Sequence, residues 1–284
     1  MVLEQLYSSN WLEQKARYAF LMGIAYSIIG IAVAIFLSTS NFIANEEIGL
    51  ASIFLISLLL VPSLNRLLLI EEKQITRENK FNVILLFRDH WDIIKVYTFL
   101  FLGMMLTFSM FSLMWPKVAT LSIFTHQANI VPTLAGRAVA GGHFLNVLGN
   151  NIGVLLLILI GSFIYGAGAI FLLTLNASVW GTIFALYIKT GVFGTNYNII
   201  IGFILLMIAI FFHLILESGS YFLAIIAGGI VSKAVIRERL FSKRFTIVIQ
   251  DALYIFIIAI IVLILAAFVE TYFTPSFIKI LGVG

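Results

Sequence analysis

The chain has 284 residues, of which 62% are hydrophobic and only 11% charged, with a formal net charge of +4. Soluble domains carry about 45–50% apolar and about 25% charged residues, so a water-soluble globule is excluded. The basic residues lie between apolar runs, which argues against a nucleic-acid-binding surface, and the absence of Cys excludes disulfides and thiolate metal sites. The composition predicts an all-α, polytopic transmembrane helix bundle.

The N-terminal part, residues 1–115, contains three long apolar runs, at residues 18–38, 48–70 and 96–115. Each is long enough to cross about 30 Å of hydrocarbon at about 1.5 Å per residue. Before them, residues 2–14 place apolar side chains among polar ones at a spacing that suits a short amphipathic helix at the membrane interface. A solvated tail explains this segment equally well.

A polar stretch, residues 116–151, separates the third run from the fourth, which we place at residues 152–175. Loops of this length are usually functional or partly helical. We therefore divide the chain into the N-terminal part, an external polar loop at 116–151 and a C-terminal helical part at 152–284.

Lys and Arg precede the first span and recur within residues 71–95 and 233–251, whereas the short loop 39–47 has none. The positive-inside rule then places the N-terminus and both basic segments on the cytoplasmic side of the cell membrane. The last span, residues 252–270, leaves the C-terminus outside.

This orientation requires an even number of crossings between residues 176 and 233, where three apolar pieces are present: 178–188, 199–216 and 220–235. In one solution 178–188 is a short half-helix that returns to the inside, and the other two pieces cross. In the other solution 178–188 crosses the membrane where the bilayer is thinned, and residues 199–232 form one long or broken helix. We favour the half-helix, which gives roughly six to eight membrane segments.

Five polar residues of the C-terminal part are candidates for an intramembrane site. His213 and Glu217 are four residues apart, so they share one helix face, and each charge at membrane depth costs about 2.5–3.5 kcal/mol. They indicate either a titratable or ligand-binding site or a polar pair that joins helices. Asn150 and Asn151 suit a helix N-cap, although one Asn suffices. Asn176 either caps the half-helix or lines a polar pocket.

Glycines on the apolar runs of the C-terminal part indicate close packing of helices, because small residues let backbones approach one another in membranes. These helix-packing candidates are Gly161, Gly166, Gly168, Gly228 and Gly229.

The chain lacks the HExxH, GxSxG and Walker A motifs. Glu71-Glu72 is similar to the start of the EExxxR motif of CAAX-type membrane proteases, but Thr76 stands where that motif has Arg. We expect no catalytic residues, no metal site and no cofactor.

Several of these features together resemble the stage II sporulation protein M family. They are Leu148-Gly149-Asn150-Asn151, the glycine-bearing span, Leu175-Asn176, His213 with Glu217, and Gly228-Gly229. Phe20-Leu21-Met22-Gly23 and His90 look like the archaeal branch of that family. Two departures are Ala177 and Leu214, which stand where the family pattern has Gly.

The resemblance implies a multi-pass membrane protein. In spore-forming bacteria, members work with peptidoglycan-degrading partners and act as membrane scaffolds, whereas members elsewhere are largely uncharacterised. We expect a non-enzymatic scaffold that contacts membrane lipids, recruits protein partners through its loops and is compatible with a homo-oligomer. The alternative is a channel, transporter or lipid-handling protein that uses the polar site, and a membrane-embedded hydrolase is less favoured.

Overall fold

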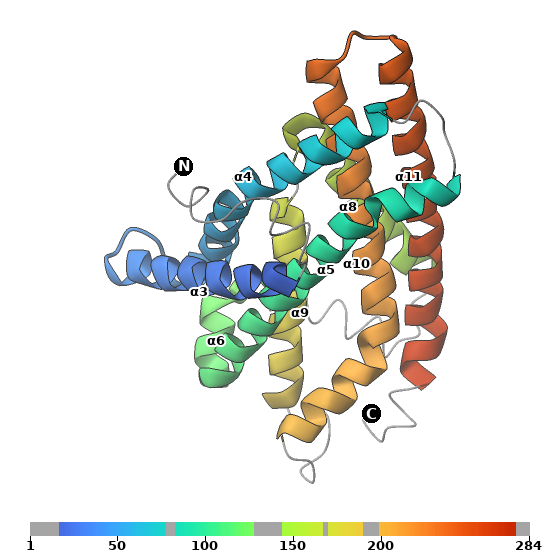
Figure 1. Ribbon diagram of the computed structural model, residues 1–284. Helices are drawn as coiled ribbons and strands as arrows, with labels where there is room; N and C mark the ends of the chain where they lie inside the picture. Colours follow the sequence, from blue (N-terminus) through green and yellow to red (C-terminus); the bar gives the residue numbers. More distant parts are fainter. Residues whose placement is uncertain (1–16, 78–82, 128–143, 167–169, 190–198, 277–284) are drawn as a thin grey trace.

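The computed structural model describes residues 17–77, 83–127, 144–166, 170–189 and 199–276. Nearly all of these residues are helical, and no strand occurs among them (Figure 1). The predicted amphipathic segment 2–14 and Gly168 lie outside the described residues.

Seven long helices lie within the described residues. Their bounds are α3 Arg17–Thr39, α4 Ile48–Arg77, α5 Val83–Met114, α8 Phe144–Tyr165, α9 Ile170–Lys189, α10 Ile199–Arg237 and α11 Lys243–Phe268. The described residues also include three shorter elements: the 3-10 helix η1 Asn45–Glu47, the α-helix α6 Lys117–Ile123 and the π-helix η3 Val269–Phe273.

Within the described residues, seven helical segments are long and apolar enough to cross a bilayer. They begin in α3, η1–α4, α5, α8, α9, α10 and α11. The predicted all-α polytopic bundle is confirmed. The stretch 116–151 contains α6 and the first turns of α8, which begins at Phe144.

The predicted half-helix is wrong. Residues 178–188 belong to α9, a continuous helix of 20 residues, which at about 1.5 Å per residue is long enough to cross about 30 Å. The fourth predicted span, 152–175, ends ten residues early, at Tyr165. The break lies at Gly166, whose φ of +61° is a left-handed conformation that Gly adopts without steric cost.

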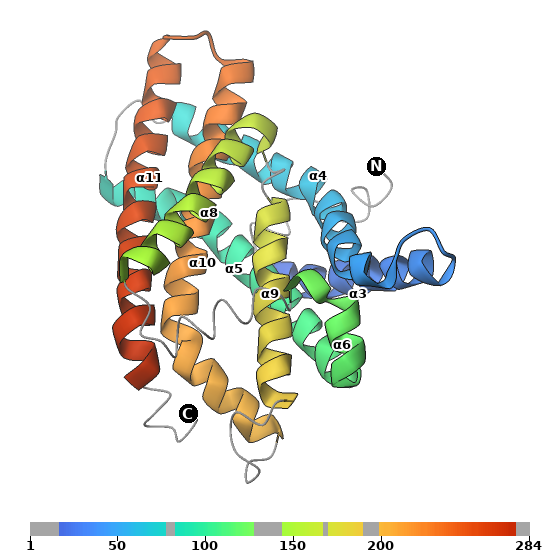
Figure 2. The same ribbon diagram turned by 180° about the vertical axis from the view of Figure 1, so that it is seen from behind.

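Residues 199–232 lie in one helix, as in the second of the two arrangements that satisfy the predicted membrane orientation. The 39-residue helix α10 includes both predicted pieces, and Gly219 between them leaves it unbroken. Figures 1 and 2 show α9, α10 and α11 running along the long direction of the molecule, with α3 lying across it and α5 obliquely.

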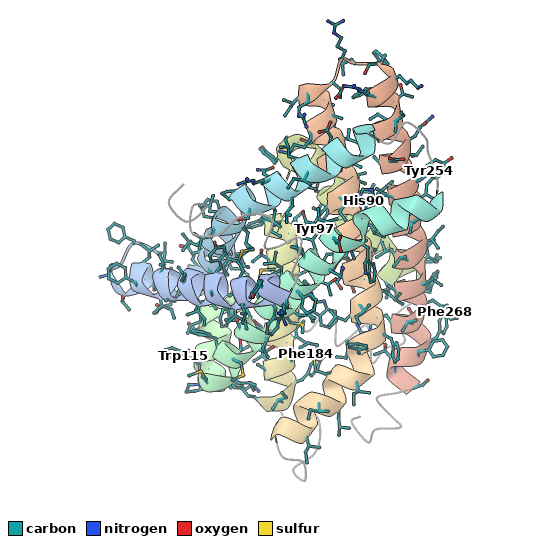
Figure 3. All side chains as sticks on the ribbon, viewed as in Figure 1. His90, Tyr97, Trp115, Phe184, Tyr254 and Phe268 are labelled. Carbon is teal, nitrogen blue, oxygen red and sulfur yellow. The ribbon has the colours of Figure 1, made fainter. Side chains whose placement is uncertain are left out.

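Helix α10 lies at the centre of the bundle and packs against α4, α5, α8, α9 and α11. The ring of Phe222 on α10 stacks on Tyr97 of α5, with centroids 6.0 Å apart, and meets Phe101 edge-on at 5.9 Å. Figure 3 shows Tyr97 on the stretch of α5 beside α10. These contacts connect the N-terminal helices to the C-terminal part through a shared aromatic core.

Glycines mark the closest approaches between helices. A Cβ on Gly228 of α10 would lie 2.5 Å from the carbonyl oxygen of Leu159 on α8. A Cβ on Gly181 of α9 would lie 2.6 Å from the carbonyl oxygen of Met105 on α5. Because backbone atoms cannot move aside as side chains do, these two interfaces need glycine.

Candidate functional site

The hairpin of α10 and α11 brings two pairs of polar residues together inside the bundle. Nδ1 of His213 lies 3.1 Å from Oγ1 of Thr274. Four residues nearer the hairpin turn on each side are Glu217 and Glu270, whose carboxylates are close enough to interact electrostatically. The two helices are antiparallel, so these pairs are successive rungs, one helical turn apart.

Tyr221 adds a hydrogen-bond donor one turn further along α10. Its hydroxyl donates to Oε1 of Glu217 across 3.1 Å. His213, Glu217 and Tyr221 are 3%, 8% and 2% exposed, so all three are withdrawn from lipid and water. Burying a carboxyl group without a partner is costly, and the tyrosine hydroxyl offsets part of that cost.

The far side of both rungs is formed where α11 gives way to a π-helix, Val269–Phe273. Thr274 follows it directly, and its hydroxyl also lies 3.3 Å from the carbonyl oxygen of Val269. The wider π-turn shifts the residues after it around the helix axis. Such π-turns are rare and frequently occur at functional sites.

Trp180 of α9 covers His213, with ring centroids 5.4 Å apart. The second imidazole nitrogen, Nε2, is buried and has no hydrogen-bond partner among the described residues. Buried polar atoms are satisfied in most structures, so this nitrogen is an exception that calls for an explanation.

Asn151 on α8 lies at the same depth in the bundle. Phe144 at the start of α8 stacks on Tyr272 of η3, while the end of α8 packs on Gly228, so α8 runs parallel to α10. Leu159 of α8 contacts Gly228 of α10. Asn151 comes eight residues before Leu159, and Ser220 comes eight residues before Gly228. Because both helices rise by the same distance per residue, Asn151 is level with Ser220.

Asn176 on α9 also lies at this depth. Trp180 of α9 contacts His213 of α10, and the two helices run in opposite directions. Asn176 comes four residues before Trp180 and Glu217 four residues after His213, so Asn176 is level with Glu217. Nδ2 of Asn176 donates to the carbonyl oxygen of Leu172 on its own helix, across 3.0 Å. We use the term polar layer for the seven residues at this depth: Asn151, Asn176, His213, Glu217, Tyr221, Glu270 and Thr274.

The expected capping roles of the asparagines are wrong. Asn150 and Asn151 lie two turns inside α8, and Asn176 lies within α9. Asn150 is exposed, and its Nδ2 lies 3.3 Å from Oδ1 of the buried Asn151.

Sequence reasoning missed three of the seven residues of the polar layer. Glu270 was assigned to the end of the last span, and neither Tyr221 nor Thr274 was singled out. The spacing offered a signal, because Glu270 and Thr274 repeat the four-residue interval of His213 and Glu217. An antiparallel hairpin with the right register brings two such pairs together.

A second polar cluster joins α4 to α10 near the hairpin turn. Glu72 is fully buried and forms an ion pair with Arg237. Nζ of Lys233 donates to Oδ1 of Asn65 across 2.8 Å, and the backbone break at Gly166 lies beside both side chains. In the part of the chain that the structure describes, no group of three or more His, Asp or Glu could hold a metal ion.

The model of one protein family, SpoIIM, stage II sporulation protein M, matches residues 96–275, well over half of the chain. The chain belongs to this family. The match starts in α5 and ends just after Thr274, so this stage II sporulation protein M family member has its whole polar layer inside the matched region. No curated protein and no solved structure matches the chain. Membership and the seven apolar spans together identify an integral membrane protein.

Proposed function

We propose that this protein is a non-enzymatic membrane scaffold, a rigid helical platform that recruits partners through its loops. One observation carries the proposal: polar side chains, at least partly withdrawn from the surface, join different helices to one another. His213 meets Thr274 across the α10–α11 hairpin, Arg237 pairs with Glu72 of α4, and Lys233 binds Asn65 of α4.

Lys189 follows the same rule at the opposite end of the bundle. Its ammonium group donates from the last residue of α9 to the carbonyl oxygens of Ser112 and Trp115, where α5 ends. It also lies 3.0 Å from the hydroxyl of Thr120 on α6. A cation at a helix C-terminus satisfies its open carbonyls and its dipole, so Lys189 fixes three helices together.

Transport through the polar layer is the second candidate function. It is supported by the neighbouring carboxylates of Glu217 and Glu270 and by Nε2 of His213, for which the described residues offer no hydrogen-bond partner. Ionisable groups at membrane depth commonly line ion or proton pathways. A scaffold needs such groups only for cohesion, so the two proposals differ in what their removal does.

The deciding experiment uses the full chain reconstituted in liposomes, with assays of proton flux, cation flux and lipid scrambling. The double variant His213→Gln with Glu217→Gln keeps side-chain volume and hydrogen bonding but removes both titratable groups. Glu46→Gln on the exposed η1 is the matched control.

The scaffold proposal expects no flux from the wild type, and for the double variant a lower unfolding temperature as its only effect. Flux by the wild type that the double variant abolishes and the control keeps would overturn it in favour of transport. Flux that survives in the double variant would contradict both proposals, since the pathway would then bypass the polar layer.

A further inference from the structure

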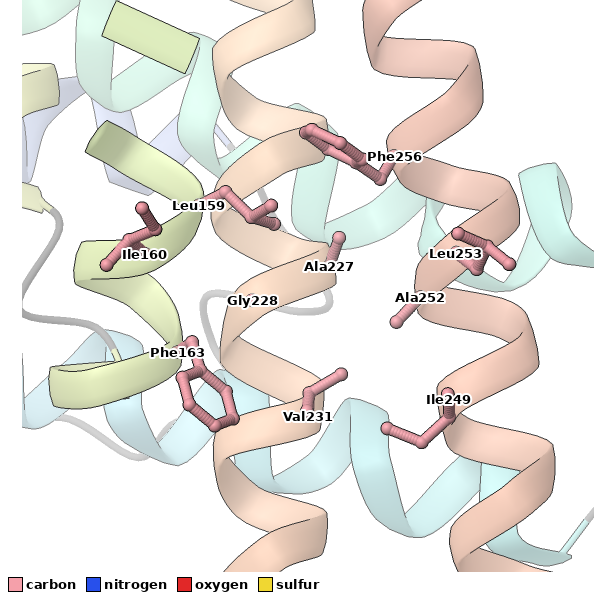
Figure 4. A pocket seen from close by; sticks show the side chains of 10 residues that line it. All are labelled: Leu159, Ile160, Phe163, Ala227, Gly228, Val231, Ile249, Ala252, Leu253 and Phe256. Atoms are coloured by element: carbon pink, nitrogen blue, oxygen red, sulfur yellow. The ribbon is translucent and has the colours of Figure 1, made fainter. Parts of the chain in front are cut away.

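An apolar groove lies between α8, α10 and α11, well away from the polar layer (Figure 4). Its volume is about 340 Å³, and all ten residues that line it are apolar. This is within the range of about 300–1,000 Å³ that small-molecule sites occupy. Because no polar side chain lines it, the groove suits a hydrocarbon occupant.

Small residues keep the groove open. Ala227 and Gly228 of α10 and Ala252 of α11 lie along its walls, as Figure 4 shows. Gly228 has no room for a side chain because α8 packs directly against it. A side chain at position 228 would therefore push α8 away from α10 and would not fill the groove.

The mouth of the groove opens on the outer surface of the bundle. Three lining residues, Ile160, Phe163 and Leu253, are 52%, 45% and 56% exposed. On a helix bundle that spans a membrane, such apolar surface faces lipid. The molecules best placed to enter the groove are therefore the acyl chains of the surrounding lipids.

Basic residues lie beyond one end of the groove. Val231 and Ile249 are the lining residues nearest the α10–α11 turn, and beyond them lie the exposed basic residues Arg239, Lys243 and Arg244. Arg244 precedes Ile249 by five residues, a rise of about 7.5 Å along α11, so the basic residues lie at the level where the headgroup of a lipid seated in the groove would be. Basic residues at a membrane surface attract anionic headgroups.

We propose that the groove binds one acyl chain of an anionic phospholipid, whose phosphate headgroup is held by Arg239, Lys243 and Arg244. The inference is independent of the scaffold proposal, since either a scaffold or a transporter would carry such a lipid. A side chain from a second copy of this protein is the competing occupant, and the test separates the two.

The test reconstitutes the full chain in phosphatidylcholine vesicles that contain a trace of photoactivatable phosphatidylglycerol or phosphatidylcholine, with the reactive group near the end of an acyl chain. Labelled peptides are located by mass spectrometry after illumination. Val231→Phe fills the groove, and Ile204→Phe adds the same ring to an exposed position of α10 away from it. Lys243→Gln with Arg244→Gln removes the charge, with Lys117→Gln as its exposed control.

We expect the phosphatidylglycerol probe to label the groove peptides in higher yield than the lipid-facing peptides of α3. The phosphatidylcholine probe should show no such excess. Val231→Phe abolishes the excess, and loss of each basic residue lowers it about five-fold. The control variants Ile204→Phe and Lys117→Gln keep the excess labelling. Equal labelling by the two probes, or labelling unchanged by the charge variant, overturns the proposal even if Val231→Phe fails to fold.

The competing occupant has its own readout, because the chain has no Cys. Ile160→Cys places a single thiol at the mouth of the groove. If a second copy fills the groove, this variant forms disulfide-linked dimers in vesicles and the excess lipid labelling is absent. That result would overturn the lipid proposal, whereas a monomeric variant with normal labelling supports it.

Discussion

The hydroxyl of Tyr221 donates a hydrogen bond to Oε1 of Glu217, one turn away on the same face of α10, across 3.1 Å. Both residues are buried, and a second carboxylate, that of Glu270, acts on them from η3. The tyrosine therefore does more than fill space, since it supplies a donor to an acidic pair that lies within the membrane.

Tyr221→Phe removes that donor and leaves the ring in place. We expect a loss of about 1–3 kcal/mol in the free energy of unfolding, because a buried acceptor loses its partner. Thermal unfolding of purified protein in detergent, followed by circular dichroism, measures the change. Tyr165→Phe on the exposed end of α8 is the control and leaves the midpoint unchanged. Equal midpoints for Tyr221→Phe and wild type would show that the hydrogen bond contributes nothing.

Two glycines of α10 give a matched pair for the packing of α8 against α10. Gly228→Ala places a Cβ 2.5 Å from the carbonyl oxygen of Leu159, whereas a Cβ on Gly219 meets nothing within 4 Å. Overpacking of this kind costs about 1–3 kcal/mol, while Gly→Ala in an open helix position gains about 0.5–1 kcal/mol. The two variants should move the unfolding midpoint in opposite directions. A shift of the same sign for both would contradict this account of the interface.

Lys189→Met tests the junction of α5, α6 and α9. The variant keeps the length of the side chain but leaves the carbonyl oxygens of Ser112 and Trp115 without their cation, and hydrogen bonds to charged groups are worth about 1.5–3 kcal/mol. We expect the unfolding midpoint to fall. Lys117→Met on the neighbouring helix α6 is exposed and should change stability by less than about 0.5 kcal/mol. A loss of equal size at Lys117 would point to surface charge in general.

The helix bundle follows from the sequence because apolar runs of about 20 residues have no other stable place than a membrane. The end of the fourth span could not be predicted in the same way. Asn176 looked like the interruption, but a helix tolerates Asn when its side chain bonds to its own backbone, as it does to Leu172. The real break, at Gly166, depends on a left-handed conformation that glycine permits without requiring.

Only part of the polar layer could be predicted from the sequence, for a related reason. His213 and Glu217 are four residues apart in the sequence, so their shared helix face is a local property. Glu270 and Thr274 join them only through the register of the α10–α11 hairpin and the π-turn at Val269–Phe273, which are properties of tertiary packing. Glu72 is buried for the same kind of reason, because α4 packs across α10 and brings it to Arg237.

The orientation in the membrane is the last prediction. The positive-inside rule places the α10–α11 turn in the cytoplasm and the loop after α3 outside. With seven crossings the start of α8 lies on the same side as that loop. Because the chain has no Cys, single substitutions report accessibility directly, and Ser40→Cys, Leu240→Cys and Leu145→Cys are all at exposed positions.

We expect a membrane-impermeant maleimide to label Ser40→Cys and Leu145→Cys in intact cells, and Leu240→Cys only after lysis. The reverse pattern would invert the topology and place the basic turn outside. Labelling of Ser40→Cys and Leu145→Cys from opposite sides would mean that α4 and α5 do not both cross, since an even number of crossings between residues 40 and 145 returns the chain to the same side. The reverse pattern would also move the proposed phosphate contacts at Arg239, Lys243 and Arg244 to the outer leaflet.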